Sequence, residues 1–387
     1  MLAVGKAAAP MLGAFLAASG IPPRRVMGVG PGHSGALPGH VDWHQGGHPI
    51  PTEASIVAAR RALELASAAG GQDLLVLLLS GGASSLMALP AGPLSLDVKQ
   101  KTVRTLLEGG ADIHELNTVR KHISAIKGGR LAAACPGSVL TLAVSDVVGD
   151  DVSVIGSGPA VGDPSTWAMA LDVFDRFGGR RAYPQEAVTW LQRGLAGEVT
   201  ETPTSDDPRL SRSMARVIGG RGVALDGAQQ AAVSLGYHVL VLDQPVVGEA
   251  RVAAAAHAAL VATAIRSSPR PLCVLSAGET TVHVTGGGKG GRNQEFALAM
   301  AGEIAALGGH VVVASVGTDG VDGPTDASGA FVDSTTIARA SAAGLEPPRV
   351  YLEDNNAYVF FEALNDLIRT APTSTNVGDL QAVLIGE

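Results

Sequence analysis

Few cysteines, few aromatic residues and few charges occur in this sequence, and each shortage excludes a class of protein. The two cysteines, Cys135 and Cys273, lie far apart and outside any metal-ligand spacing, so neither a disulfide scaffold nor a zinc site is predicted. Aromatic residues make up 4% of the 387 residues, too few to expect base stacking. The net charge of -8, from 28 basic and 36 acidic residues, gives no basic field for a nucleic-acid backbone.

Long apolar runs are also missing. The longest, residues 74–79, ends at Ser80-Gly81-Gly82, far short of the ~20 residues that span a bilayer. Near the N-terminus, the apolar stretch 7–18 has two interpretations: a signal peptide, or a helix that follows a buried strand at residues 2–4 and a turn at Gly5-Lys6. Together with the scarcity of cysteine, these features favour a cytoplasmic protein that binds neither membrane nor nucleic acid.

Short apolar runs alternate with Ala- and Leu-rich stretches, which is typical of βα units around a mainly parallel sheet. We expect strands at 26–29, 73–79, 139–144, 237–242, 272–276, 281–285 and 310–316, and helices at 53–69, 96–108, 222–235, 249–266 and 293–307. The turn-rich segment 197–208 is either a domain boundary or a long surface loop. The fold class is therefore α/β, with expected domains 1–208 and 209–387.

Glycine, with 50 residues, is concentrated where predicted strands pass into predicted helices. Three such junctions resemble anion-binding loops, in which free backbone N–H groups meet a ligand: Gly5-Lys6, residues 80–85 and residues 286–295. The second predicts phosphate contacts from Ser80, Gly81, Gly82 and Ser84. The third adds the cations Lys289 and Arg292. For any one loop, the alternative is a tight turn that uses glycine for its positive φ.

Two glycine patterns point to other nucleotide sites only weakly. No Gly-x-x-x-x-Gly-Lys-Ser/Thr string is present, so a P-loop kinase is not predicted. Residues 30–35 match Gly-x-Gly-x-x-Gly but are followed too soon by Pro38 to open a helix, and we interpret them as a loop. Residues 286–291 match it in better context, but no acidic residue ends a following strand at the expected distance. A nicotinamide site therefore stays a weak alternative.

Carboxylates follow two other predicted strands, at residues 146–151 and 319–326. In open α/β sheets, ligands bind beyond the carboxyl ends of the strands, so these acids should face the same site as the glycine loops. Magnesium prefers such oxygen ligands. Asp146 and Asp319, close behind their strands, are the predicted functional carboxylates and tentative metal ligands, whereas Asp322 and Asp326 fit turns equally well.

Basic residues gather in Asn117-Thr118-Val119-Arg120-Lys121-His122. Such a run is either the solvated face of a helix or a binding site for a substrate carboxylate or phosphate. In the second interpretation Arg120 is best suited, because its fork matches either group, and Lys121 would assist it.

Several long strings together resemble the class II glycerate kinases, whose C-terminal region is called the MOFRL domain. They are Val4-Gly5-Lys6-Ala7-Ala8, Gly47-His48-Pro49-Ile50-Pro51, Leu79-Ser80-Gly81-Gly82, the string 117–122, Ser145-Asp146-Val147-Val148-Gly149-Asp150-Asp151, Gly156-Ser157-Gly158-Pro159, Gly290-Gly291-Arg292-Asn293-Gln294-Glu295-Phe296, Gly317-Thr318-Asp319-Gly320 and Thr375-Asn376-Val377-Gly378-Asp379-Leu380. The resemblance covers almost the whole chain. The family's usual Ser-Gly-Gly-Gly-Ser is Ser80-Gly81-Gly82-Ala83-Ser84 here, so Ala83 must have a negative φ.

This resemblance implies a Rossmann-like N-terminal domain, a C-terminal α/β domain with a mixed sheet, and an active site in the cleft between them. It implies ATP and a divalent cation, Mg²⁺, as cofactors, with D-glycerate phosphorylated at its 2-hydroxyl. Lys6 and Arg292 match the family's catalytic cations. We place Asp146 and Asp319 with them by position, and expect Glu279, Asn293 and Glu295 among the substrate-binding residues.

In this hypothesis the cations stabilise the transferring phosphoryl group, and the aspartates hold the metal or orient the hydroxyl. Arg292→Ala should lower kcat by orders of magnitude with little loss of folding stability. The alternatives are a hydroxypyruvate reductase that uses NAD(P)H, and a non-catalytic sensor of sugar acids or nucleotides. The expected partners are the small-molecule substrates D-glycerate and ATP, and a second copy of the chain in a homodimer.

Overall fold

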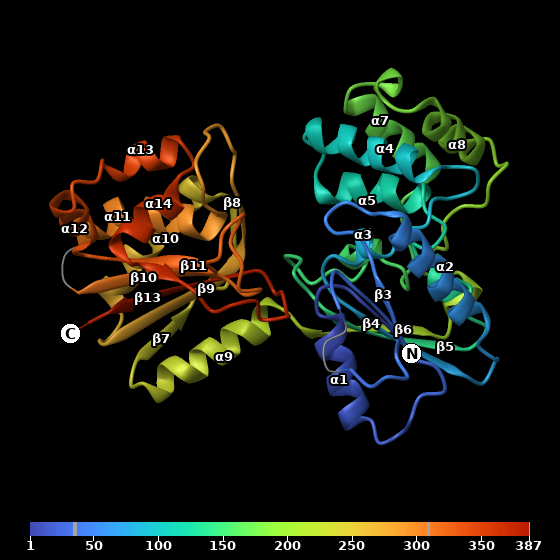
Figure 1. Ribbon diagram of the computed structural model, residues 1–387, viewed down its shortest axis with the longest axis horizontal. Coiled ribbons are helices and arrows are strands. Elements are labelled where there is room, and N and C mark those ends of the chain that lie inside the picture. The colour runs from blue at the N-terminus through green and yellow to red at the C-terminus, as the bar shows by residue number, and fades with distance from the viewer. Residues whose placement is uncertain (34–36, 308–309, 387) are drawn as a thin grey trace. The chain divides into compact units, whose positions relative to one another are not determined.

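The computed structural model describes residues 1–33, 37–307 and 310–386, which form two compact units (Figure 1). The first unit contains Met1–Ser145 and Asp150–Ile218, and the second contains Asp146–Gly149 and Gly219–Glu387. The first unit thus continues past residue 208, at which the sequence analysis places the boundary, because residues 213–219 form a strand of its sheet.

A six-stranded sheet in the order β3-β2-β1-β4-β5-β6 forms the centre of the first unit. Its strands are β1 (Leu2–Val4), β2 (Met27–Gly30), β3 (Asp42–Gln45), β4 (Leu74–Leu79), β5 (Ser138–Val144) and β6 (Ser213–Gly219). Strands β1 to β5 pair in parallel. The expected parallel sheet of the N-terminal domain is confirmed, and so is the buried strand at residues 2–4, whose side chains are fully enclosed.

The strand order of this sheet reverses between β1 and β4: β2 and β3 lie on one side, β5 and β6 on the other. At such a switch point the loops after the two central strands diverge, leaving room for a ligand at their carboxyl ends. Gly5-Lys6 follows β1 and Ser80-Gly81-Gly82 follows β4. The topology therefore brings two of the three glycine junctions together.

The helices of the first unit form two groups (Figure 1). Helix α1 (Ala8–Ala18) packs on the sheet, with Leu12 in a core that includes Ala3 and Leu78. At one end of the unit, α4 (Leu96–Glu108), α5 (Ile113–His122), α7 (Trp167–Arg176) and α8 (Gln185–Leu195) enclose a separate core around Phe174. The remaining helices are α2 (Glu53–Ser67), α3 (Ala83–Leu86) and α6 (Arg130–Ala133).

Helix α5, which carries the basic string 117–122, is well specified by its own sequence. Asp112 accepts hydrogen bonds from the His114 and Glu115 amides, and the Glu115 carboxylate accepts one from the Asp112 amide. This capping box satisfies N–H groups that would otherwise be unpaired at the start of the helix. Three basic residues in its last turn, Arg120, Lys121 and His122, complement the negative end of the helix dipole.

The second unit has a mixed sheet in the order β12-β11-β10-β13-β9-β7, with β8 also paired to β9. Its strands are β7 (His238–Val241), β8 (Val246–Glu249), β9 (Leu272–Thr281), β10 (Val311–Gly317), β11 (Gly329–Asp333), β12 (Leu367–Ile368) and β13 (Asp379–Ile385). Strands β7 and β8 run parallel to β9, and the other pairs are antiparallel. The mixed sheet expected for the C-terminal domain is confirmed.

Helices cover the two faces of this second sheet unequally (Figure 1). A large core under one face includes side chains of α10 (Ala250–Ser267), α11 (Arg292–Leu307), α12 (Thr336–Ala342) and α14 (Ala357–Leu364), next to α13 (Pro348–Glu353). The other face has a smaller core, to which α9 (Arg221–Ser234) contributes Leu225 and Ala232. The position of Arg292 as the first residue of α11 matters most for the site.

Most predicted elements agree with the structure to within a few residues, and one does not. The strand expected at 281–285 is wrong, because β9 runs from Leu272 to Thr281 and residues 282–285 form a loop. Strands β3, β6, β8, β11, β12 and β13 are not among the predicted ones. The loop predicted at residues 30–35 lies partly outside the described residues.

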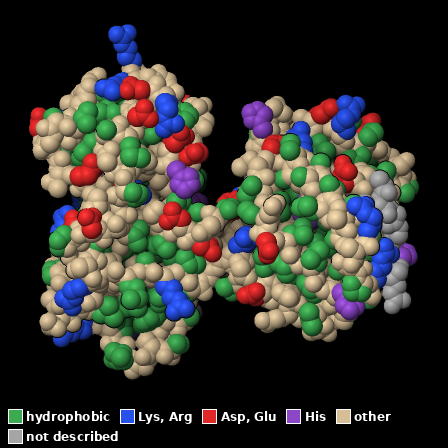
Figure 2. Space-filling model, turned by 180° about the vertical axis from the view of Figure 1, so that it is seen from behind, with side chains coloured by type: hydrophobic (Ala, Val, Ile, Leu, Met, Phe, Trp, Pro, Cys, Tyr) green, Lys and Arg blue, Asp and Glu red, His purple; other side chains and the backbone are tan. Residues whose placement is uncertain are grey.

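Charged side chains are interspersed over the surface. On the face shown in Figure 2, basic and acidic side chains lie among one another on both units, without a continuous basic area. Both cysteines are buried and free. Within the described part of the chain, no helix has both the length and the apolar character needed to cross a membrane.

Candidate active site

The first two glycine junctions lie directly against each other in the first unit. Gly5 has a φ of 131°, and a Cβ atom there would lie 2.1 Å from Ser80 Oγ, so only glycine fits. The Lys6 amide donates to the Gly81 carbonyl at 2.8 Å, and the Ala7 amide donates to Ser80 Oγ at 3.0 Å. Ser80 is buried, so its hydroxyl closes the turn that positions Lys6.

Lys6 and His48 approach each other over Gly82. Gly82 has a φ of 82°, and a Cβ atom at this position would lie 3.0 Å from His48 Cδ2 and 3.3 Å from Lys6 Cγ. Burial, together with the charge of Lys6, lowers the pKa of His48. The imidazole is therefore neutral at physiological pH and available as a hydrogen-bonding group beside the lysine.

After Gly82, the chain turns into the short helix α3 and presents Ser84 to a second glycine string. Ala83 lies inside this helix and is not among the residues with positive φ, as the sequence analysis required. The hydroxyls of Ser84 and Ser157 are hydrogen-bonded at 3.0 Å, and Ser157 donates to Asn117 Oδ1 at 2.8 Å. The strings 80–85, 117–122 and 156–159 thus form one polar cluster in the first unit.

The basic residues at the end of α5 have different partners. Lys121 forms a buried ion pair with Asp163 at 3.2 Å, and His122 Nε2 lies 2.8 Å from Glu201 Oε1. Arg120 is partly buried, and in the described part of the chain no carboxylate lies within ion-pair distance of it. Arg120 therefore remains suited to an anion, whereas the geometry gives Lys121 a structural role instead of the predicted binding role.

In the second unit, Arg292 is held by two carboxylates. Its Nε and Nη2 groups donate to Asp379, at 2.8 Å to Oδ2 and 3.0 Å to Oδ1, and Nη1 donates to Glu279 Oε1 at 2.9 Å. The Asp379 side chain is completely buried, while 31% of the Arg292 side chain is exposed. A guanidinium has five N–H groups, so unshared N–H groups on Nη1 and Nη2 remain for a ligand.

The charges around Arg292 are strongly coupled. Burial raises the pKa of Asp379 and of Glu279, and the positive charge of Arg292 opposes this rise in both. Burial alone would lower the pKa of Arg292, but the two carboxylates raise it above its ordinary value. Arg292 is therefore a permanent cation whose direction is fixed before any substrate binds.

The neighbours of Arg292 on α11 support this arrangement from inside the protein. Asn293 is buried, donates to Asp379 Oδ1 at 2.9 Å and accepts from Ser315 Oγ at 2.7 Å. Glu295 is buried as well, and its carboxylate accepts hydrogen bonds from Arg251 and Asn355. Both residues were predicted to bind substrate, but the geometry places them behind Arg292, where they hold other side chains.

Most amide groups of the third glycine junction have partners within the protein. The amides of Thr285 and Gly286 donate to Asn355 Oδ1, that of Gly287 to Asp354 Oδ1, and that of Lys289 to Asn356 Oδ1. The start of α11 is occupied too, because the Asn293 and Gln294 amides donate to Asp322 at 3.0 and 2.9 Å. Residues 354–356 thus hold the amides of residues 285–287 and 289, and Lys289 lies over the Tyr358 ring, 3.9 Å from its centroid.

Asp322 is the structural carboxylate of this region. Gly291 passes so close that a Cβ atom there would lie 2.3 Å from Asp322 Cγ. Asp322→Ala should therefore lower the free energy of unfolding by roughly 2–4 kcal/mol, because two buried amides would lose their acceptor. Urea unfolding measures this, with exposed Asp326→Ala as the control, for which a change of about 0.5 kcal/mol is expected. Equal effects of the two substitutions would contradict the assignment.

The predicted metal ligands, Asp146 and Asp319, both border the segment 376–378 of the second unit. Asn376 donates to Asp146 Oδ2 at 3.1 Å. Thr318, adjacent to Asp319, accepts from the Val377 amide at 2.9 Å and donates to the Gly378 carbonyl. Asp146 also lies close enough to Glu279 to raise the pKa of that residue. The structure thus connects both aspartates to the segment that leads into Asp379.

These carboxylates fit magnesium, which takes one or two carboxylates together with substrate phosphates and water. In the described residues, no group of three or more His, Cys, Asp or Glu side chains is arranged to hold a metal ion by itself.

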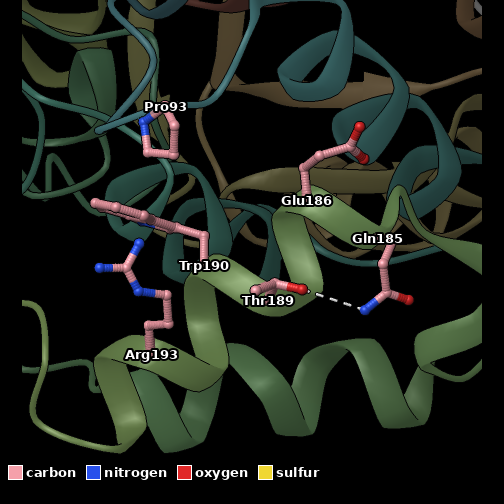
Figure 3. Close-up of a pocket in the computed structure, with 6 residues that line it drawn as sticks. All are labelled: Pro93, Gln185, Glu186, Thr189, Trp190 and Arg193. Atoms are coloured by element: carbon pink, nitrogen blue, oxygen red, sulfur yellow. Dashed lines mark hydrogen bonds between the residues drawn. The ribbon is translucent and has the colours of Figure 1, made fainter.

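A separate hollow lies in the helical part of the first unit (Figure 3). It has a volume of about 450 Å³ and is lined by Pro93, Gln185, Glu186, Thr189, Trp190 and Arg193. The Arg193 guanidinium lies 5.9 Å from the centre of the Trp190 ring. No predicted site residue lines this hollow, and no ionised group is buried in it to bind a substrate.

Sequence reasoning did not assign a role to several residues that the structure brings into these clusters. These residues are His48, Asn117, Ser157 and Asp379. Each occurs in a string that supported the family resemblance, and no other sequence pattern indicated a functional role for them. Asp379 is separated from Arg292 by 87 residues, so no local spacing could reveal their contact.

Comparison with protein families gives two matches along the chain. Residues 1–192 match a domain of unknown function, DUF4147, and residues 272–379 match the MOFRL family.

Individual proteins match over a larger part of the chain. The D-glycerate 2-kinase of Thermotoga maritima is 39% identical over 390 residues, which cover 100% of this chain and 90% of the relative. An Agrobacterium vitis protein named putative hydroxypyruvate reductase is 40% identical over 100% of this chain and 87% of the relative. The crystal structure of the Thermotoga maritima glycerate kinase matches with a TM-score of 0.88 and 38% identity, over 99% of this chain and 90% of that one. The chain therefore belongs to the glycerate 2-kinase family, with a C-terminal MOFRL region.

Proposed function

We propose that this protein transfers the γ-phosphoryl group of ATP to the 2-hydroxyl of D-glycerate, giving 2-phosphoglycerate and ADP. Its family membership supports this activity. The observation that carries the proposal is the geometry of Arg292, whose guanidinium is fixed by Asp379 and Glu279 and keeps unshared N–H groups. A transferring phosphoryl group spreads negative charge over its equatorial oxygens, and a fixed cationic fork stabilises that charge.

Residues of the first unit supply the other binding groups in this proposal. Lys6 is the second cation for the transferring group, and the turn at Gly81, Gly82 and Ser84 contacts phosphates. Arg120 binds the carboxylate of glycerate. The proposal requires both units to act on the same pair of substrates, and this shared active site stays a prediction. The homodimer and the cytoplasmic location stay predictions as well.

Phosphoryl transfer needs one bond made and one broken. The 2-oxygen of glycerate forms a bond to the γ-phosphorus while the bond from that phosphorus to the β,γ-bridging oxygen breaks, and ADP leaves with the electron pair. The hydroxyl proton passes to a carboxylate, for which Asp146 and Asp319 are the candidates. These two residues would also hold Mg²⁺, which supplies positive charge at the phosphate oxygens when bound. Which aspartate has which role is left open.

Hydroxypyruvate reduction is the second candidate, because two relatives have that name and the strand order of the first sheet is that of nicotinamide-binding folds. Such folds contact the pyrophosphate through a glycine-rich turn after the first strand. Here that turn is Gly5-Lys6, whose amides donate to the Val29 and Gly81 carbonyls. In the other glycine-rich loop, the amides of residues 285–287 and 289 are occupied by residues 354–356. The geometry therefore favours the kinase, and no observation favours a non-catalytic sensor.

Phosphorus NMR of the reaction mixture tests the proposal directly. With D-glycerate, ATP and Mg²⁺, we expect the phosphate resonance of 2-phosphoglycerate and stoichiometric ADP. Product phosphorylated at the 3-position would refute the regiochemistry alone. Oxidation of NADH or NADPH by hydroxypyruvate, without release of ADP from ATP in the presence of D-glycerate, would establish the reductase instead.

A further inference from the structure

Three cationic side chains gather at the C-terminal end of α5 in the first unit: Lys99 from α4, Arg120 from α5, and Lys127 from the turn that follows. Lys99 and Lys127 are 4% and 2% exposed. Lys99 Nζ donates to the Ile123 carbonyl at 3.2 Å and reaches the Arg120 carbonyl at 3.5 Å. Lys127 Nζ donates to the Gly156 carbonyl at 3.2 Å. These carbonyls provide hydrogen bonds and, at the end of α5, partial negative charge, but no carboxylate charge.

Buried lysines are ordinarily paired with a carboxylate, because an isolated buried charge is costly. Lys121 follows this rule through its ion pair with Asp163. In the described part of the chain, Lys99, Arg120 and Lys127 form no ion pair. The three residues therefore place uncompensated positive charge next to the polar cluster of Ser84, Ser157 and Asn117.

The titration behaviour of this group agrees with its geometry. Burial, followed by the charge of Arg120, lowers the pKa of Lys99 to about 7. Burial and the charges of Lys99 and Arg120 lower the pKa of Lys127 well below its ordinary value, and burial lowers that of Arg120. Beyond burial, the charges that lower the pKa of Lys99 and of Lys127 are all cations, so a bound anion would relieve the repulsion among them.

A purely structural role explains only part of this arrangement. Lys99 satisfies carbonyl groups at the end of α5, as a C-terminal cap does, but a neutral donor such as glutamine would serve there equally well. A structural role also leaves the charge of Lys127 unexplained. One anion bound between Arg120 and the serine cluster accounts for all three cations.

We propose that Lys99 and Lys127 are specificity-determining residues, which together with Arg120 form a cationic site for the carboxylate of the hydroxy-acid acceptor. The inference rests on the proposed kinase function and deepens it. The carbonyl end of α5 faces this site, so it lacks the row of backbone N–H groups that holds nucleotide phosphates. The planar Arg120 fork matches a carboxylate as well as a phosphate, and the comparison of D-glycerate with ATP in the test below distinguishes the two. Acceptors without a carboxylate would leave the buried charges unpaired and be rejected.

Charge-removing variants at both lysines test the inference. Lys99→Met and Lys127→Met should each raise the KM for D-glycerate roughly ten- to a hundred-fold, while the KM for ATP changes by less than about two-fold. Lys99→Gln keeps a hydrogen-bond donor for the Ile123 carbonyl and should raise the KM equally. Lys101→Met is the matched control, because Lys101 lies on the same helix, exposed and paired with Asp97, and no change is expected.

The pH dependence of KM gives a readout that a structural role would not change. In the wild type, Lys99 loses its proton as the pH rises above about 7, so the KM for D-glycerate should increase there. The described charged groups facing Lys99 are the cations Arg120 and Lys127, which titrate in the same direction. Lys99→Gln should lack this component of the pH profile, and Lys99→Arg should restore a low KM without it.

Two results would overturn the inference: an unchanged KM for D-glycerate in folded Lys99→Gln and Lys127→Met, or equal increases for D-glycerate and ATP. If the wild type shows no kinase turnover, the proposed function fails. Calorimetric titration with D-glycerate alone then tests whether the cationic site binds the hydroxy acid. Binding by the wild type that weakens at least ten-fold in Lys99→Gln supports it. Equal binding by the two proteins, or none by the wild type, refutes it.

Discussion

Arg292→Ala is expected to lower kcat by roughly 10³- to 10⁵-fold, the range in which a cationic fork stabilises phosphoryl transfer. The free energy of unfolding should fall too, by about 3–5 kcal/mol, because the completely buried Asp379 would lose its ionic partner. This second effect corrects the expectation from sequence alone, which was little loss of stability. Steady-state assays with D-glycerate and ATP, and urea unfolding, measure the two effects separately.

Matched variants separate catalysis from stability at Arg292. Arg339 forms a similar bidentate ion pair with the buried Asp366, at 3.0 and 2.7 Å. Arg339→Ala should therefore destabilise the protein and leave kcat unchanged. Combining Arg292→Ala with Asp379→Asn should recover part of the stability without recovering activity. Wild-type turnover in Arg292→Ala would remove this residue from the mechanism.

Lys6→Met is expected to lower kcat by on the order of 10³-fold, through loss of the cation that follows β1. The turn itself should survive, because its hydrogen bonds come from the Lys6 and Ala7 backbone amides and the Ser80 hydroxyl. Thermal unfolding should therefore change little. The same assay measures kcat, and direct titration with ATP shows whether nucleotide binding persists.

The control for Lys6 is Arg24→Met, which removes a highly exposed cation of the same unit that pairs with Asp73 at 3.5 Å. Exposed ion pairs of this kind contribute little, so kcat should stay at the wild-type level. If Lys6→Met retained full activity, or if it failed to fold while Arg24→Met folded normally, the assignment of Lys6 as a catalytic cation would be lost.

Local patterns predicted much of the fold because each reflects a short-range physical preference. Helix α4 has the bounds expected from its apolar periodicity, and β4 has the continuous apolar residues of a strand buried on both faces. The error at 281–285 arose where an alternating pattern entered a loop whose amides are held by residues 354–356. Contacts between residues so far apart in the sequence cannot be predicted from local sequence patterns.

Part of the candidate site was predictable for the same reason. Gly5-Lys6 and Ser80-Gly81 had to meet if their strands were neighbours in a parallel sheet, and β1 and β4 are such neighbours. Partnership between side chains could not be predicted in this way. The basic string favoured Arg120 and placed Lys121 beside it as an assisting group, and only the structure shows that Asp163 pairs with Lys121.

Glycine content was the most misleading signal. In the richest glycine loop, the amides of residues 286–289 are bonded within the protein. The sparser junctions after β1 and β4 also bond their amides internally, at residues 5–7, but they flank Lys6 and Ser84. Glycine occurs where the backbone closely approaches another group, which can be a ligand or another part of the protein. In this loop that neighbour is the protein's own backbone at Asp354 and Asn356.

The central place of β13 has a consequence during protein synthesis. This strand lies between β10 and β9 and carries Asp379, which the ribosome adds 87 residues after Arg292. Until then, the nascent chain has two open strand edges that could pair with other chains. A chain that stopped before this strand would be an aggregation-prone fragment rather than a weakened enzyme, because the strand that closes both edges also supplies the partner of the arginine.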